Sequence, residues 1–133
     1  IRAVIATTDM LPAAGQGALG IEIRQDQTAL LEAFAALTDR ATWLAVHAER
    51  AVSRALGGSC SMPLAAFAQW QGDTLELRAL LGHPQDATQP LLRASLSGRP
   101  ADAAAAEALG IAAADALRAQ GGTALLAALE PAA

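Results

Sequence analysis

Cys60 is the only cysteine in the chain, and it lies in the stretch Gly-Gly-Ser-Cys-Ser over residues 57–61. A thiol can act as a nucleophile or carry a covalently bound group. Cysteines that merely fill space usually lie on the apolar faces of helices and strands. This one lies in a predicted loop, where a side chain can face a cleft. Its position leaves both an inert and a reactive thiol open.

The surroundings of Cys60 favour one kind of reactivity over another. A hydrolytic thiol needs a base nearby and usually a helix N-terminus to stabilise the thiolate. Cys60 instead follows the C-terminus of a predicted helix, whose negative dipole end disfavours the thiolate, and Arg50 and Arg54 offset only part of that effect. A thiol that reacts once to form a permanent thioether needs only access and a strong electrophile. A covalent tether therefore fits the sequence better than a nucleophile that turns over.

Other polar residues give weaker signals. Arg50 and Arg54 are four positions apart on one helical face, where like charges repel, so we expect an acidic partner or an anionic ligand near Arg50 and solvent around Arg54. His47 and His83 are expected to be packed or exposed, and we predict no metal site.

The stretch "AAGQGALG" contains Gly15, Gln16 and Gly17. It lacks the lysine of a phosphate-binding loop, so we do not expect it to bind a nucleotide. The residues by themselves indicate a plain turn.

The hydrophobic patterns predict the elements that position these residues. Period-2 alternation indicates three consecutive strands between Pro63 and Gly98, and helical spacing indicates helices beginning at Thr28 and near residues 38–40, with further helices at 102–119 and after Gly122. Two earlier strands are predicted at 3–7 and 18–24. The expected fold is α+β: a three-stranded antiparallel sheet covered on one face by helices, preceded by two strands left over from upstream domains. We assign 1–25 to those upstream domains and 26–133 to a C-terminal domain.

Composition excludes several classes of protein. The chain is 53% hydrophobic and 17% charged, which is typical of a globular domain. No apolar run approaches the roughly 20 residues that span a bilayer. A net charge of −4 without a basic cluster argues against nucleic acid as a partner. A single cysteine and the lack of a leader favour the cytoplasm, and the start at Ile1 suggests an excised piece.

Two long motifs carry a resemblance to a known family. "ERAVSRALGGSCSMPLA", residues 49–65, resembles the cofactor-attachment signature of the porphobilinogen deaminases, also called hydroxymethylbilane synthases. "MLPAAGQGALGIEIR", residues 10–24, resembles the preceding segment of the same family. Met62 departs from the Val, Ile or Thr usual in that family, which is a conservative apolar change.

The resemblance implies a three-domain transferase that joins four porphobilinogen molecules into hydroxymethylbilane, with release of ammonia. It implies that Cys60 holds a dipyrromethane primer through a thioether and that Gly15, Gln16 and Gly17 border the active cleft. The catalytic carboxylate would lie upstream, so this piece alone should be inactive. Its partners would be porphobilinogen, the growing pyrrole chain, and the missing N-terminal and central domains. Glu49 and Arg50 are expected to form ion pairs with those domains.

Two other functions stay open on the residues alone. A Cys-His hydrolase would need His47 or His83 within about 3.2 Å of the sulfur and a third group to orient it. A non-catalytic interaction domain would instead present an apolar contact patch. Trp43 and Trp70 are expected in the core or at a domain interface.

Overall fold

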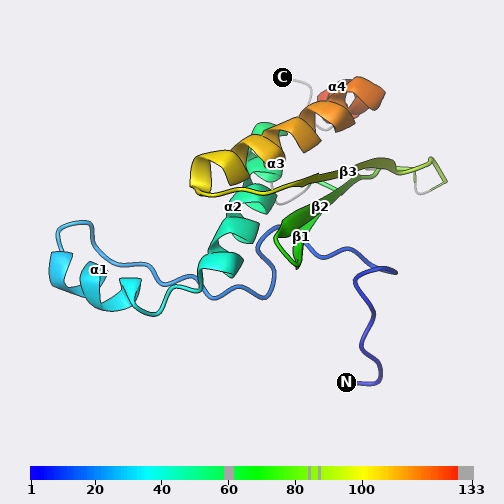
Figure 1. Ribbon diagram of the computed structural model, residues 1–133. Coiled ribbons are helices and arrows are strands. Elements are labelled where there is room, and N and C mark those ends of the chain that lie inside the picture. Colours follow the sequence, from blue (N-terminus) through cyan, green and yellow to red (C-terminus); the bar gives the residue numbers. More distant parts are fainter. Residues whose placement is uncertain (59–61, 84, 87, 129–133) are drawn as a thin grey trace.

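The computed structural model describes residues 1–58, 62–83, 85–86 and 88–128. It contains four α-helices and three strands within these ranges (Figure 1). In chain order they are α1 (Thr28–Ala35), α2 (Arg40–Ala55), β1 (Leu64–Gln71), β2 (Thr74–Leu81), β3 (Leu92–Gly98), α3 (Ala103–Leu117) and α4 (Thr123–Ala127), with a kinked turn (Arg118–Gly122) between the last two helices.

The three strands form an antiparallel meander in the order β1-β2-β3. Leu77 pairs with Ala68 on one side and with Leu96 on the other, which fixes the register. The alternating residues Leu75, Leu77, Ala79 and Leu81 have no exposed surface. Because successive side chains of a strand point to opposite faces, one face of the sheet is buried and the other carries polar residues. The predicted meander and its buried face are confirmed.

Helices α2 and α3 cover the buried face and cross each other (Figure 1). Small residues permit the close crossing: Ala48, Ala51, Ala106, Ala113 and Ala114 are buried there. Gly110 lies at the contact, since a Cβ on it would be 2.6 Å from the Cβ of Ala51 and would overlap the carbonyl oxygen of Ala48. Helix packing of this kind confirms the α+β expectation, and it explains why a glycine is present inside an otherwise alanine-rich helix.

The predicted strands at 3–7 and 18–24 are absent. Residues 1–27 form turns and extended chain without strand pairing. Val4, Ile5, Leu19 and Ile21 are 89%, 59%, 99% and 60% exposed. An extended segment becomes a stable strand only when a neighbour satisfies its backbone groups. No element of the described chain pairs with these segments. The alternating pattern alone was therefore not enough to make them strands.

Aspartate side chains cap two of the helices, and the helix start expected at residues 38–40 is confirmed. Asp39 and Asp102 precede α2 and α3, and their side chains accept hydrogen bonds from the backbone N–H groups of Thr42 and Ala105. Thr28, however, is the first residue of α1 and is preceded by Gln27, which makes no side-chain cap bond. A threonine hydroxyl at that position cannot serve as the cap because its residue already has helical geometry.

Asp39 gives a pH-dependent contribution to stability. Hydrogen bonds from Thr42 lower the pKa of the Asp39 carboxyl below its usual value, so the cap stabilises the fold above that value and is lost as the pH falls through the lowered pKa. We expect Asp39→Ala to lower the melting temperature at pH 7, and we expect this difference to shrink on acidification. Asp39→Asn, which keeps an acceptor but no charge, should lose the pH dependence and keep most of the stability. Thermal unfolding followed by circular dichroism between pH 7 and pH 3 measures this, and a constant gap for Asp39→Ala would contradict it.

Candidate functional site

The stretch that contains Cys60 connects α2 to β1. Helix α2 ends at Ala55, Leu56 is buried with 4% exposure, and Gly57 and Gly58 take left-handed φ values of 100° and 54°. On the C-terminal side of this stretch, Met62 packs against the core. Cys60 itself, with Ser59 and Ser61, lies outside the described residues. Its two flanks are therefore held by the core.

The second flank is tied directly to the sheet. The carbonyl oxygen of Pro63 accepts a hydrogen bond of 2.9 Å from the N–H of Gly82, just beyond the end of β2. This bond extends the pairing of β1 and β2 toward the Cys60 stretch. Both flanks of the Cys60 stretch are thus attached to the rest of the fold.

The structure confirms that the Cys60 stretch follows the C-terminus of a helix, α2. Cys60 follows the C-terminus of that helix, where unpaired carbonyl groups carry partial negative charge. The Arg118 guanidinium donates a hydrogen bond to one of them, the carbonyl of Ala55. A helix N-terminus, which would activate a thiolate, does not precede Cys60.

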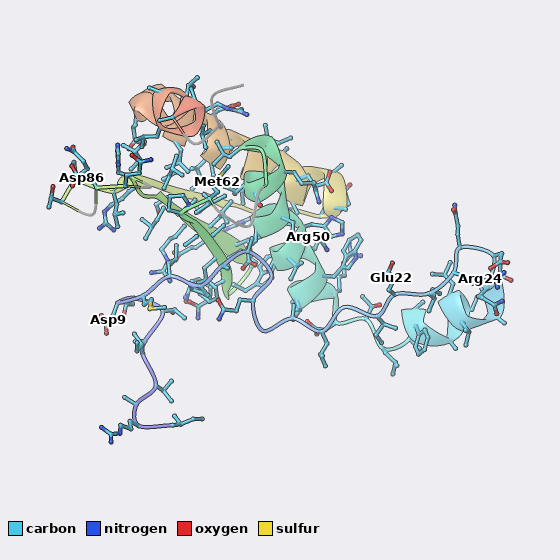
Figure 2. All side chains as sticks on the ribbon, turned by 180° about the vertical axis from the view of Figure 1, so that it is seen from behind. Asp9, Glu22, Arg24, Arg50, Met62 and Asp86 are labelled. Atoms are coloured by element: carbon cyan, nitrogen blue, oxygen red, sulfur yellow. The ribbon has the colours of Figure 1, made fainter. Side chains whose placement is uncertain are left out.

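A groove of about 940 Å³ runs along α2 between that helix, α1 and the segment before α1. Apolar side chains form much of its wall, among them Ile21, Leu31, Phe34 and Trp43. Arg50 is exposed and lines the groove (Figure 2). No carboxylate pairs with Arg50 within the described ranges. The groove thus combines apolar surface with a cation suited to a carboxylate.

Arg54 differs from the expectation of simple solvation. Its guanidinium lies 3.0 Å from a carboxylate oxygen of Glu107 on α3, although the side chain remains 55% exposed. The same oxygen lies 3.1 Å from Nδ1 of His47. The hydrogen bond with His47, more than the charge of Arg54, lowers the pKa of Glu107. Packing of α2 on α3 created this network, which sequence spacing within α2 could not reveal.

His47 and His83 are both occupied by local contacts. The ring of His47 lies 4.3 Å from that of Trp43, centroid to centroid, and contacts Glu107. Nδ1 of His83 accepts a hydrogen bond of 3.3 Å from the N–H of Gln85. His47 precedes the end of α2 by about 12 Å along the helix axis, at 1.5 Å per residue, whereas His83 follows Gly82, which bonds Pro63 beside the Cys60 stretch. Because Cys60 lies outside the described residues, the Cys-His hydrolase stays an untested alternative. Within the part of the chain that the structure describes, no cluster of three metal-ligating side chains occurs.

The predicted site residues Gly15, Gln16 and Gly17 form a compact double turn. Gln16 N–H donates to the carbonyl of Ala13 at 3.0 Å, and Ala18 N–H donates to that of Gly15 at 3.2 Å. Gly15 and Gly17 have φ values of 74° and 87°, which favour glycine. Gly15 lines the large groove, whereas Gln16 and Gly17 line a smaller hollow of about 330 Å³. The structure brings this turn against α2 and β1.

Glu49 contradicts the expected ion pair with missing domains. It is only 5% exposed, and its carboxylate accepts hydrogen bonds of 2.7 Å from the N–H of Gly15 and from the N–H of Ala68. Burial raises the pKa of Glu49, although the two hydrogen bonds act in the opposite direction. Its partners lie inside the chain because α2 turns this side chain toward the sheet.

A signal for Glu49 existed in the sequence. Its position continues the spacing of Ala45, Val52 and Leu56 along α2, which are all buried. A carboxylate on an apolar helical stripe must find hydrogen-bond donors inside the fold. The pattern therefore indicated a buried, paired Glu49, but it could not indicate which groups would pair with it.

The two tryptophans lie at different depths. Trp70 packs partly against the core, and its indole N–H donates a 3.0 Å hydrogen bond to the carbonyl of Ala41. Trp43 is 39% exposed and lines the groove. Trp70 meets the expectation of a core residue, and Trp43 lies on a surface that could form an interface.

Comparison with known proteins places the chain. The family model for the C-terminal domain of porphobilinogen deaminase matches residues 43–119. The chain belongs to this family. The match covers the helices and strands from α2 to α3, including the Cys60 stretch between them.

Curated relatives match the chain along nearly its whole length. It is 53% identical to the porphobilinogen deaminase of Albidiferax ferrireducens over 131 residues, which is 96% of this chain and 41% of that protein. It is 52% identical to the porphobilinogen deaminase of Burkholderia thailandensis over 129 residues, with 97% and 39% covered. For that of Bordetella parapertussis the identity is 51% over 131 residues, with 98% and 40% covered. The chain thus spans about two fifths of the length of these relatives.

None of the helices in the described ranges combines the length and the apolar character needed to cross a membrane. The longest, α2, has 16 residues and several charged side chains.

Proposed function

We propose that this chain is the cofactor-carrying C-terminal part of a cytoplasmic hydroxymethylbilane synthase, a transferase of tetrapyrrole and heme biosynthesis. The whole enzyme would condense four porphobilinogen molecules with loss of ammonia. The observation that carries the proposal is the match to porphobilinogen deaminases over nearly the whole chain. In this proposal residues 26–133 form the attachment domain, and residues 1–25 belong with the missing domains.

Cys60 is the residue that would hold the dipyrromethane. Its Sγ would form a thioether to the aminomethyl carbon of a pyrrole, while the amino group of that carbon leaves as ammonia and takes up the thiol proton. This step needs no strongly activated thiolate, in agreement with a position after the C-terminus of α2. Once bound, dipyrromethane supplies the acceptor end to which further pyrroles are added.

The groove beside α2 fits such a group. Pyrroles of this class carry acetate and propionate side chains, and Arg50 offers an exposed guanidinium in an otherwise largely apolar wall. Guanidinium and carboxylate groups form charge-assisted hydrogen bonds. Arg50 would bind a carboxylate of the pyrrole chain or of a missing domain, and the Gly15–Gly17 turn would form part of the groove border.

Exposed apolar side chains support missing domains as partners. Leu19 and Ile21 precede α1, Leu31 lies on it, and Leu37 follows it, and they are 99%, 60%, 60% and 70% exposed. Figure 1 shows α1 and the segment before it extending away from the sheet, and Figure 2 shows Glu22 and Arg24 in this region. Contiguous exposed apolar surface is typical of an interface. This part alone would be inactive because the family's catalytic carboxylate lies upstream.

Mass spectrometry tests the proposal. The longer protein that contains this chain is expected to have an intact mass above that of its polypeptide by one thioether-linked dipyrromethane. Peptide mapping should place the added mass on the peptide that contains Cys60. An unmodified Cys60 in active protein, or an adduct on another residue, would overturn the tether.

A further inference from the structure

Glu49 joins three parts of the chain that are distant in sequence. From α2, one carboxylate oxygen reaches the backbone N–H of Gly15, 34 positions earlier, and the other reaches the backbone N–H of Ala68, 19 positions later. Both distances are 2.7 Å. The side chain is 5% exposed, and no cation pairs with it among the described residues. Its charge is stabilised by two backbone amides instead.

The contact with Ala68 closes an open edge of the sheet. β1 is an edge strand, and the N–H groups of Ala66 and Ala68 point away from β2. The carbonyl of Pro12 accepts the first at 3.2 Å, and Glu49 accepts the second. Unpaired edge groups invite pairing with other chains, so this arrangement also protects the edge.

The contact with Gly15 is one of few that hold the N-terminal segment. Within the described ranges, two hydrogen bonds join residues 1–24 to α2 and the sheet: the N–H of Gly15 donates to Glu49, and the N–H of Ala66 donates to the carbonyl of Pro12. Ala14 adds apolar packing against the core. Much of the remaining segment is exposed, including Val4 and Leu19. The attachment is therefore concentrated in residues 12–15.

We propose that Glu49 is a positioning residue that clamps the Gly15–Gly17 turn to the edge of β1 and so holds segment 1–24 in place relative to the domain that carries Cys60. An effect of Glu49 on catalytic turnover rests on the proposed function. The clamp itself depends only on the geometry of this chain. A carboxylate is required because both of its oxygens accept, whereas an amide side chain has one acceptor and would place its N–H₂ against one of the two donors.

Residue-resolved amide hydrogen exchange by NMR on the 133-residue chain tests the clamp. In Glu49→Gln we expect exchange at Gly15, Ala66 and Ala68 to accelerate at least about tenfold. The amides of Leu77 and Ala79 on the central strand should change much less, because they open only with the core. Glu76→Gln, on the exposed face of β2, serves as the matched control and should leave all of these rates unchanged.

Two outcomes would overturn the clamp. Unchanged protection at Gly15 in Glu49→Gln would show that the turn is held without the carboxylate. Equal acceleration at Gly15 and at Leu77 would show that Glu49 acts only through global stability. If Glu49→Gln fails to fold, Gly15→Ala provides the test from the other partner, since a φ of 74° strains alanine without altering the buried side chain. It should release the same local amides and spare Leu77, and unchanged rates at Gly15 and Ala66 would count against the clamp.

The longer protein separates this inference from the proposed function. Glu49→Gln should retain the Cys60 adduct in its intact mass and lose at least about tenfold in kcat. An adduct with unchanged kcat would overturn the positioning role. If the longer protein without any substitution carried no adduct, the proposed function would be overturned. The hydrogen-exchange result on the clamp would still hold.

Discussion

Gly110→Ala is expected to destabilise the fold by about 3 kcal/mol or more, because it adds a methyl group where two helices cross closely. The new Cβ would overlap the backbone carbonyl oxygen of Ala48 and lie 2.6 Å from the Cβ of Ala51. Neither neighbour can rotate away, because one is backbone and the other is a methyl group attached directly to it. Helices α2 and α3 would have to separate, and with them the buried face of the sheet would lose contacts.

A reversed substitution on the same helix provides the control for Gly110→Ala. Helix propensity alone favours alanine over glycine by about 1 kcal/mol. Ala112 is exposed on α3, so Ala112→Gly should cost only that amount. Urea unfolding of both variants measures the two free energies. Stabilisation by Gly110→Ala would show that the helices do not cross as closely as described.

Cys60→Ser is expected to abolish turnover of porphobilinogen by the longer protein. A serine hydroxyl is a much weaker nucleophile than a thiol unless a base activates it, so the thioether would not form. Under the proposed function, no pyrrole chain can grow without the anchored primer. The fold should remain, because serine is close to cysteine in size. The melting temperature should therefore match that of the protein without the substitution.

Neighbouring positions supply the controls for Cys60→Ser. Ser61→Ala removes a hydroxyl beside the thiol, and Met62→Val restores a residue usual in the family. Both variants should retain the adduct and the turnover, measured as hydroxymethylbilane formed from porphobilinogen. Full activity of Cys60→Ser would remove the tether from the mechanism.

Both predictions involve helix α2. The close α2–α3 crossing at Gly110 fixes the helix that leads to Gly57, and the bond between Pro63 and Gly82 fixes the strand that follows. Loops that carry function are commonly held by a rigid scaffold in this way. The stability of the core and the placement of the two flanks of the Cys60 stretch are thus linked.

Local patterns in the sequence determined the sheet and the caps of α2 and α3, and they predicted which residue would carry an attached group. Leu75, Leu77, Ala79 and Leu81 alternate with polar neighbours, and this pattern is a property of the strand itself. Asp39 and Asp102 bond to amides three residues away, so their role is also local. The Gly-Gly-Ser-Cys-Ser stretch predicted a tether at Cys60, which lies outside the described residues and stays a prediction.

Only the tertiary structure decided what depends on partners far along the chain. The alternating residues 18–24 remain unpaired because no strand of the described chain lies beside them, and the pattern within a segment does not determine its neighbour. Glu49 was expected to face missing domains but is buried against Gly15 and Ala68, while Arg54 meets Glu107 on another helix. Such contacts form when packing brings distant segments together. The sequence shows that a charged residue on an apolar stripe needs a partner, but it does not show which group the partner is.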